Sequence, residues 1–171
     1  MVTLNGSTVA KGADVLAQVA DRMLETRFLM VRAAGHTPDG PLPPNVVVAD
    51  RTDPRYVYAQ TRVLLMPSTT ESYGRAGVEA MLSGIPVLAA PLPGIREALG
   101  TAATYILRED TDRWVAELHR LSGPAAYGAA SAGSRAHAEA LDYAQNIREF
   151  EAMCRRLCSP TALTPRACHF R

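Results

Sequence analysis

The stretch that decides the fold reads Val63-Leu64-Leu65-Met66-Pro67-Ser68, followed after two threonines by Glu71-Ser72-Tyr73-Gly74-Arg75-Ala76-Gly77-Val78-Glu79. The first part is a short apolar run that is typical of a buried strand, and the second part opens a helix that ends near Ser83-Gly84. A glycine at the start of a helix leaves backbone N–H groups open to an anion, and the helix dipole favours negative charge there. The two glutamates stand on either side of that point, which is typical of a nucleotide-sugar site.

The rest of the chain repeats this alternation of apolar runs and helical patterns. We expect strands at residues 2–5, 27–32, 45–49, 63–66, 86–89 and 104–107. We expect helices at residues 11–24, from the capping pair Asp53-Pro54 to residue 60, around Glu79, at 95–99, at 111–121, and one or two within 136–157. Uniformly apolar strands alternating with helices predict a parallel sheet covered on both faces. The predicted fold class is α/β, a single Rossmann-like doubly wound domain.

Three ordered motifs resemble the large retaining glycosyltransferases of the GT-B fold, called group 1 or family four. The central motif is Pro67-Ser68 with Glu71-x-Tyr73-Gly74-x4-Glu79-Ala80-Met81-x2-Gly84-x-Pro86-Val87. Upstream lies Lys11-Gly12, which is similar to the family's phosphate-binding lysine, and downstream lies Gly94-x2-Glu97. The order and spacing agree over residues 1–122, and they correspond to the C-terminal, donor-binding half of that fold.

The central motif predicts how a nucleotide would lie. Backbone N–H groups of Gly74, Arg75 and Ala76 are expected to meet the diphosphate. Glu79 stands five residues beyond Gly74, about 7.5 Å along a helix axis. The resemblance implies that Glu79 accepts hydrogen bonds from the two ribose hydroxyls and that Glu71 lies close to the donor sugar. The alternative is that Glu71 is a first-turn capping acid and Glu79 a solvated helix residue.

The flanking motifs would complete the site. Lys11 is expected at the start of the first helix, where its ammonium can neutralise charge that grows on the diphosphate as the glycosidic bond breaks. By resemblance, backbone donors near Gly94 face the sugar or phosphate, with Glu97 at the next helix start. The alternatives are a solvated lysine, a turn glycine and a helix-capping acid.

The sequence departs from the family before Lys11. The family carries an arginine there, whereas this chain reads Asn5-Gly6-Ser7-Thr8. We expect Ser7 or Thr8 to supply hydroxyl bonds in its place, or Arg75 to supply the charge. Loss of the arginine also allows a lower affinity for the donor.

No cofactor and no metal are expected besides the nucleotide-diphosphate sugar itself. Asp50-x-x-Asp53 is not the Asp-x-Asp pair of metal-dependent sugar transferases, and the stretch 50–52 is expected to border the base instead. Cys154, Cys158, Cys168 and His169 lack a Cys-x2-Cys pair, so free thiols are favoured over zinc. Transfer is expected to proceed with retention and without a Ser–His triad.

The chain is expected to comprise a nucleotide-sugar-binding domain at residues 1–122, helices at 123–158 and a disordered tail at 159–171. The acceptor-binding half of the resembled family is missing, so we expect either a split or truncated enzyme, with that half on another chain, or a stand-alone nucleotide-sugar-binding module. A sugar-nucleotide epimerase is a third, weaker interpretation. The net charge of +1 gives no reason to expect nucleic acid. No apolar run is long enough to span a membrane, and no signal peptide is visible, so a cytoplasmic location is expected.

Overall fold

A computed structural model describes residues 1–32, 36–38 and 40–158. Its centre is a sheet of six parallel strands in the order β3-β2-β1-β4-β5-β6. The strands are β1 (Val2–Asn5), β2 (Phe28–Arg32), β3 (Val46–Asp50), β4 (Val63–Met66), β5 (Val87–Ala89) and β6 (Thr104–Tyr105). The predicted doubly wound fold is therefore confirmed, and the strand order reverses between β1 and β4.

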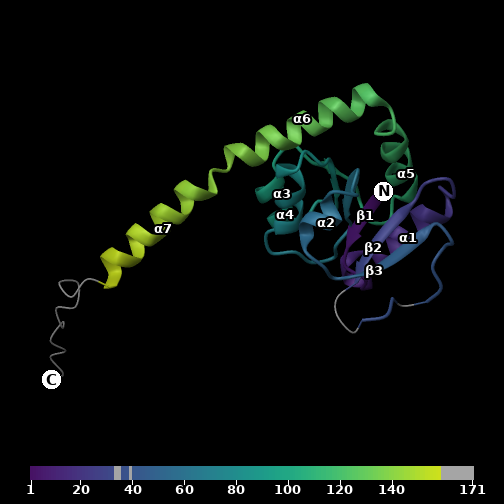
Figure 1. Ribbon diagram of the computed structural model, residues 1–171, viewed down its shortest axis with the longest axis horizontal. Coiled ribbons are helices and arrows are strands. Elements are labelled where there is room, and N and C mark those ends of the chain that lie inside the picture. Colours follow the sequence, from purple (N-terminus) through teal and green to yellow (C-terminus); the bar gives the residue numbers. More distant parts are fainter. Residues whose placement is uncertain (33–35, 39, 159–171) are drawn as a thin grey trace, which may run out of the picture. The chain divides into compact units, whose positions relative to one another are not determined.

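Helices cover both faces of this sheet (Figure 1). The helices of the described residues are α1 (Ala13–Asp21), α2 (Pro54–Tyr58), α3 (Arg75–Leu82), α4 (Pro93–Leu99), α5 (Thr111–Arg120), α6 (Pro124–Ala140) and, in a separate unit of the chain, α7 (Tyr143–Cys158). A 3-10 turn, η1 (Val9–Lys11), precedes α1. Because side chains alternate along a strand, a central strand such as β4 contributes side chains to both layers. Leu65 packs into the core beneath α1 and α5, while its neighbour Met66 points toward α3, where its sulfur lies close to Gly77.

The larger core lies between the sheet and the layer of α1 and α5. Its fully buried members include Leu16 and Trp114, and the indole N–H of Trp114 donates to the carbonyl oxygen of Leu107 at 2.9 Å. At about 25 cal/mol per Å² of buried apolar surface, a fully buried aromatic of this size stabilises the fold by several kcal/mol. This layer fixes the sheet edge from which the loops of the site emerge.

The expectation that every strand is covered on both faces was wrong for β3. This strand is the sheet edge, and its Val47 and Val48 are 52% and 36% exposed. An apolar sequence shows that a segment can form a strand, but it does not show where in the sheet the strand lies. β3 pairs only with β2 and therefore lies at the edge.

The first helix also begins differently from the prediction. Lys11 closes the 3-10 turn η1, and α1 starts only at Ala13. The reason is Gly12, which adopts a left-handed conformation with φ of 98° and interrupts the helix. Thr8 caps η1 by accepting a hydrogen bond from the backbone N–H of Lys11 at 3.3 Å.

The Ala/Ser/Gly-rich stretch after residue 122 forms α6, within the range 123–158 where helices were expected. Small side chains let it pack closely: Ser131 donates to the carbonyl oxygen of Gly84 at 2.6 Å, and His137 lies 2.9 Å from that of Ala98. Two compact units result, residues 1–139 and the remainder, which contains α7. The tail predicted to be disordered lies outside the described residues.

Candidate functional site

A cavity opens at the carboxyl ends of β1 and β4, where the strand order reverses. In doubly wound sheets this is the place where ligands bind. The cavity measures about 530 Å³, which suits a nucleotide-sized molecule. It is lined by seven of the nine predicted site residues, namely Ser7, Lys11, Glu71, Gly74, Arg75, Ala76 and Glu79.

Lys11 and Glu71 meet across this cavity although they are 60 residues apart in sequence. Lys11 Nζ donates to Glu71 Oε2 at 2.6 Å, a short charge-assisted bond. The two side chains are 42% and 19% exposed, so the pair remains accessible to a ligand. The loops after β1 and β4 therefore bring a cation and a carboxylate to one point.

The N-terminus of α3 faces the same cavity. Gly74 is the N-cap residue, with φ of 82°, and no side chain caps the helix. Its left-handed backbone would be strained by any L side chain, whereas an added Cβ would be only in ordinary contact with Met66 and Ile95. The first backbone N–H groups of α3, those of Arg75 and Ala76, are left to an outside acceptor.

Glu79 is held from both sides. Its Oε1 lies 3.1 Å from Arg75 Nε, and the Tyr58 hydroxyl lies 3.1 Å from Oε2 and 3.2 Å from the carbonyl oxygen of Ala76. Burial and the nearby charge of Glu79 raise the pKa of Tyr58 above its usual range. Tyr58 is therefore a hydrogen-bond donor at every physiological pH, and it orients the carboxylate.

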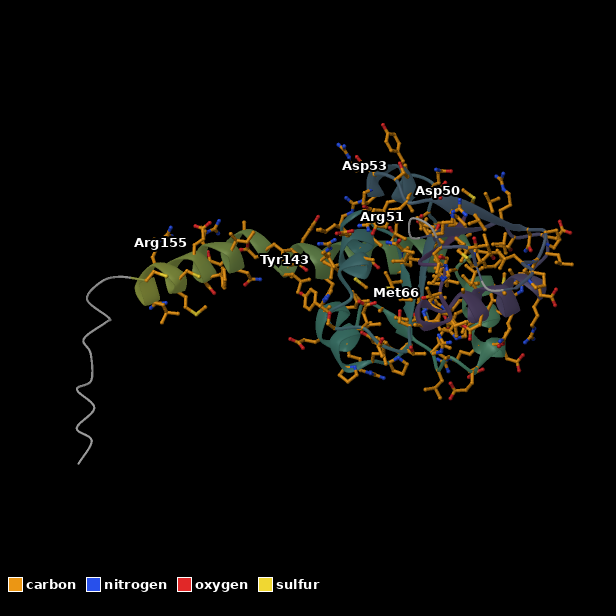
Figure 2. The ribbon with its side chains drawn as sticks, turned by 90° about the horizontal axis from the view of Figure 1, so that it is seen from below. Asp50, Arg51, Asp53, Met66, Tyr143 and Arg155 are labelled. Atoms are coloured by element: carbon orange, nitrogen blue, oxygen red, sulfur yellow. The ribbon has the colours of Figure 1, made fainter. Side chains whose placement is uncertain are left out.

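Ser7 and the segment after β3 form the remaining wall. Ser7 is buried, and its Oγ lies 3.0 Å from His36 Nδ1. Arg51 and Thr52 line the cavity, whereas Asp50 points to Arg32 and bonds its Nε at 2.6 Å. Figure 2 shows Asp50 and Arg51 at the end of β3. Arg32, Arg51 and Arg75 are further cations that line the cavity.

Gly94 and Glu97 do not line this cavity. Gly94 is the second residue of α4 and lies in close contact with the loop after β4, because an added Cβ would lie 2.0 Å from the carbonyl oxygen of Ser72. Glu97 is exposed on α4. In the structure Gly94 thus lets α4 approach the segment that carries Glu71, and a direct role of either residue toward a ligand stays a prediction.

Sequence reasoning gave no role to Tyr58, although it placed the residue on a short helix. The signal that was available is its position at the end of α2, one turn after the Pro54 start. That Tyr58 reaches Glu79 depends on how α2 packs beside α3, which no local pattern encodes.

No group of three or more His, Cys, Asp or Glu side chains in residues 1–32, 36–38 and 40–158 is arranged to hold a metal ion. None of the helices in this part of the chain is both long and apolar enough to cross a membrane. Cys154 and Cys158 are free thiols, and Cys168 and His169 lie outside the described residues.

Comparison with known proteins shows the family to which this chain is similar. A family model described as "Glycosyl transferases group 1" matches residues 2–123. A D-inositol 3-phosphate glycosyltransferase of Nocardiopsis dassonvillei is 32% identical over 114 residues, which cover 65% of this chain and 27% of that protein. The chain thus spans about a quarter of the length of this curated relative.

Solved structures resemble the chain in fold at low identity. The C-terminal domain of a group 1 family glycosyl transferase from Francisella tularensis matches with a TM-score of 0.68 and 14% identity, covering 81% of this chain and 83% of that one. A pneumococcal O-GlcNAc transferase, solved with UDP and GlcNAc, matches with a TM-score of 0.74 and 18% identity, covering 91% of this chain and 35% of that one.

Proposed function

This chain belongs to the glycosyl transferases of group 1, and from that premise we propose that its cavity binds a nucleotide-diphosphate sugar as the donor for glycosyl transfer. The complete protein is proposed to transfer the sugar with retention to an acceptor held by a further domain, because this chain spans about a quarter of its curated relative. No cofactor is invoked besides the donor.

The observation that carries the proposal is the convergence at the switch point of the sheet. Lys11 arrives from the loop after β1, while Glu71 and the uncapped start of α3 arrive from the loop after β4. A cation and a helix N-terminus on one side of a cavity are suited to a diphosphate. A carboxylate beside them is suited to hydroxyl groups, which are donors toward it.

We assign the roles from this arrangement. The diphosphate lies at the backbone N–H groups of Gly74, Arg75 and Ala76 and near Lys11. Glu79, oriented by Tyr58, accepts from the ribose hydroxyls, and Glu71 accepts from hydroxyls of the sugar. When the bond between the anomeric carbon and the diphosphate oxygen breaks, the electron pair stays on the diphosphate. Lys11 and the α3 N-terminus stabilise that growing charge.

Binding is tested first with the purified chain. Thermal shift measurements with UDP, GDP and ADP and their sugar derivatives should identify one base that raises the melting temperature. Calorimetry with that nucleotide should show weaker binding by Lys11→Ala and by Glu79→Ala, each by about 1.5–3 kcal/mol for a lost charge-assisted contact. Unchanged affinity of both variants would refute the site.

A direct probe is available because Lys11 is the only lysine in the sequence. Protein labelled with 15N-lysine therefore gives a single lysine side-chain signal, and the nucleotide should shift it. Transfer itself is tested by slow hydrolysis of the nucleotide sugar, which an active donor site supports at a low rate and a binding-only module does not. A chelator should leave nucleotide binding unchanged.

A further inference from the structure

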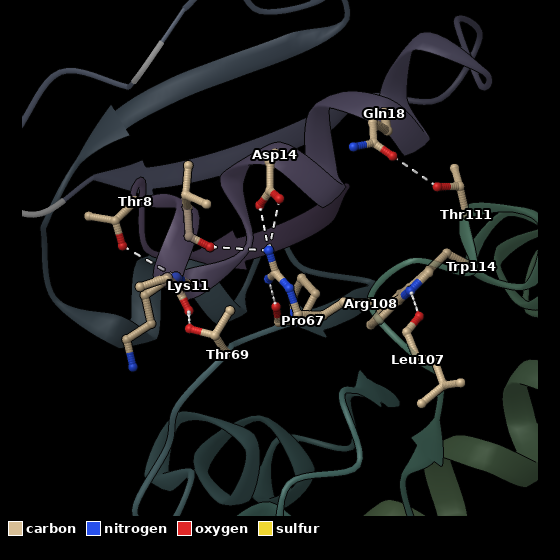
Figure 3. A network of polar contacts seen from close by, with 12 residues as sticks. Thr8, Lys11, Asp14, Gln18, Pro67, Thr69, Leu107, Arg108, Thr111 and Trp114 are labelled. Carbon is tan, nitrogen blue, oxygen red and sulfur yellow. Dashed lines mark hydrogen bonds and ion pairs between the residues drawn. The ribbon is translucent and has the colours of Figure 1, made fainter.

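We propose that Arg108 is a positioning residue for the donor site, although it does not line the cavity. It follows β6, and Figure 3 shows its guanidinium group between Asp14 and Pro67. The inference rests on the proposed function for its ligand, and it concerns how the two halves of the site are held together.

The guanidinium group joins three segments. Nη1 donates to the carbonyl oxygen of Pro67, in the loop after β4. Nη2 donates to the carbonyl oxygen of Val9 at 3.4 Å, in η1, and to both carboxylate oxygens of Asp14 on α1, at 2.8 and 2.9 Å. One planar group thus spans the loop after β1 and the loop after β4, which a lysine amine cannot do with the same geometry.

These contacts are close in sequence to Lys11 and Glu71. Val9 stands two residues before Lys11, and Pro67 stands four residues before Glu71. The backbone N–H of Thr69 donates to the carbonyl oxygen of Ala10 at 2.9 Å and adds a direct link between the same loops. Besides the 2.6 Å bond from Lys11 to Glu71, the two loops are thus joined by the backbone bond of Thr69 and by the side chain of Arg108.

Arg108 is itself well fixed. Its side chain is 20% exposed and that of Asp14 35%, so the ion pair is partly removed from solvent. The preceding residue, Leu107, accepts the hydrogen bond of the fully buried Trp114. A rigid anchor of this kind reduces the freedom of the Lys11 loop before a ligand arrives, which is how positioning residues increase affinity.

The test compares Arg108→Met with Arg62→Met as a matched control. Arg62 also donates to two carbonyl oxygens, those of Leu121 at 3.2 Å and Ser122 at 3.3 Å, but it lies outside the cavity. We expect Arg108→Met to weaken nucleoside diphosphate binding about 5- to 10-fold and Arg62→Met to leave it unchanged. Equal affinities of the two variants would overturn the inference.

A double-mutant cycle separates positioning from general loss of stability. If Arg108 acts through Lys11, then Lys11→Ala should weaken binding at least about 10-fold in the wild-type background and only about 2-fold in the Arg108→Met background. Additive effects would contradict this role. Should Arg108→Met fail to fold by circular dichroism, the cycle is run with Asp14→Asn, which keeps the shape of the carboxylate and removes its charge.

A measurement without ligand keeps this inference separable from the proposed function. Amide hydrogen exchange at Thr69 should be at least about 10-fold faster in Arg108→Met, or in Asp14→Asn, and unchanged in Arg62→Met. If no nucleotide binds the wild-type chain, the proposed function fails, and this exchange experiment still decides whether Arg108 joins the two loops. Unaltered exchange at Thr69 overturns the inference.

Discussion

Replacing Glu71 by glutamine should tighten the binding of a free nucleoside diphosphate. In the unliganded site Glu71 neutralises Lys11 through their 2.6 Å bond, so an incoming diphosphate meets a carboxylate beside the cation that it needs. Glutamine keeps the size of the side chain and removes the charge. The ion pair itself, half exposed, is worth about 0–1 kcal/mol, so its loss should affect the stability of the fold little.

The size of the effect follows from Coulomb's law. For a diphosphate of about three charges roughly 6 Å from the carboxylate, repulsion in water is about 2 kcal/mol. Screening at physiological salt reduces it to about 1 kcal/mol, which corresponds to about 5-fold tighter binding. A nucleotide sugar should gain less or lose affinity, because Glu71→Gln also removes a charge-assisted bond to the sugar, worth about 1.5–3 kcal/mol.

The assay is calorimetry of wild type and Glu71→Gln with the diphosphate and with its sugar derivative, at low and high salt. Glu117→Gln is a close control, since Glu117 is 18% exposed and pairs with Arg120 at 2.7 Å on α5, outside the cavity. The control should bind both ligands as wild type does. Weaker binding of the free diphosphate by Glu71→Gln would refute the reasoning, because Glu71 would then support the diphosphate rather than repel it.

Three further outcomes are expected. Tyr58→Phe should weaken nucleoside diphosphate binding by about 0.5–1.5 kcal/mol, because Glu79 loses a hydrogen bond, and should leave pyrophosphate binding unchanged; an equal loss for pyrophosphate would contradict this. The Asp53 carboxyl accepts from the side chain and backbone of Arg55, which lowers its pKa to about 2, so its stabilisation is complete above about pH 4 and lost as the pH falls toward 2. The melting temperatures of wild type and Asp53→Asn should therefore differ at pH 6 and converge at pH 2. In urea titrations Gly94→Ala should lower the free energy of unfolding by about 1–3 kcal/mol, whereas Gly128→Ala, with open space in α6, should raise it by about 0.5–1 kcal/mol; equal values would refute the close contact at Gly94.

The fold was predictable because its strands are encoded locally. Several apolar runs adjoin proline or glycine, such as residues 45–49 after Pro44 and residues 63–66 before Pro67, and their alternation with helices favours a parallel sheet. What the pattern does not encode is competition between strands for the centre of the sheet. The valines of β3 therefore read as buried, although they lie at the edge.

The helical boundaries failed where glycine or small residues carry tertiary information. Gly12 reads as part of a helix but separates η1 from α1, because its left-handed backbone lets the chain pass Pro67 closely. In α6, glycines lower the helix propensity of an alanine-rich segment, and the tertiary hydrogen bonds of Ser131 and His137 to the rest of the sheet unit are not encoded in the local pattern.

The site was predicted as far as its motifs reach. Lys11, Glu71 and Glu79 were singled out by motifs that resemble the family, and the structure brings all three to one cavity, while their roles toward a ligand stay predictions. Tyr58 and Arg108 were not predicted, because each makes its contact with an element that is distant in sequence and adjacent only in the folded structure. Their chemistry, a phenol and a guanidinium, is too common in sequences to mark them.

The order of the strands has a consequence for how the molecule acquires its site. Between the two halves of the site the chain makes a long excursion through β2 and β3 before β4 returns to pair with β1. Closing that loop carries an entropic penalty, and such non-local pairing is slow compared with the formation of single helices. A nucleotide that contacts both loops binds only chains in which this closure is complete. Such a nucleotide stabilises the pairing of β1 with β4, the two paired strands that are farthest apart in sequence. It should therefore lower the unfolding rate more than it raises the folding rate.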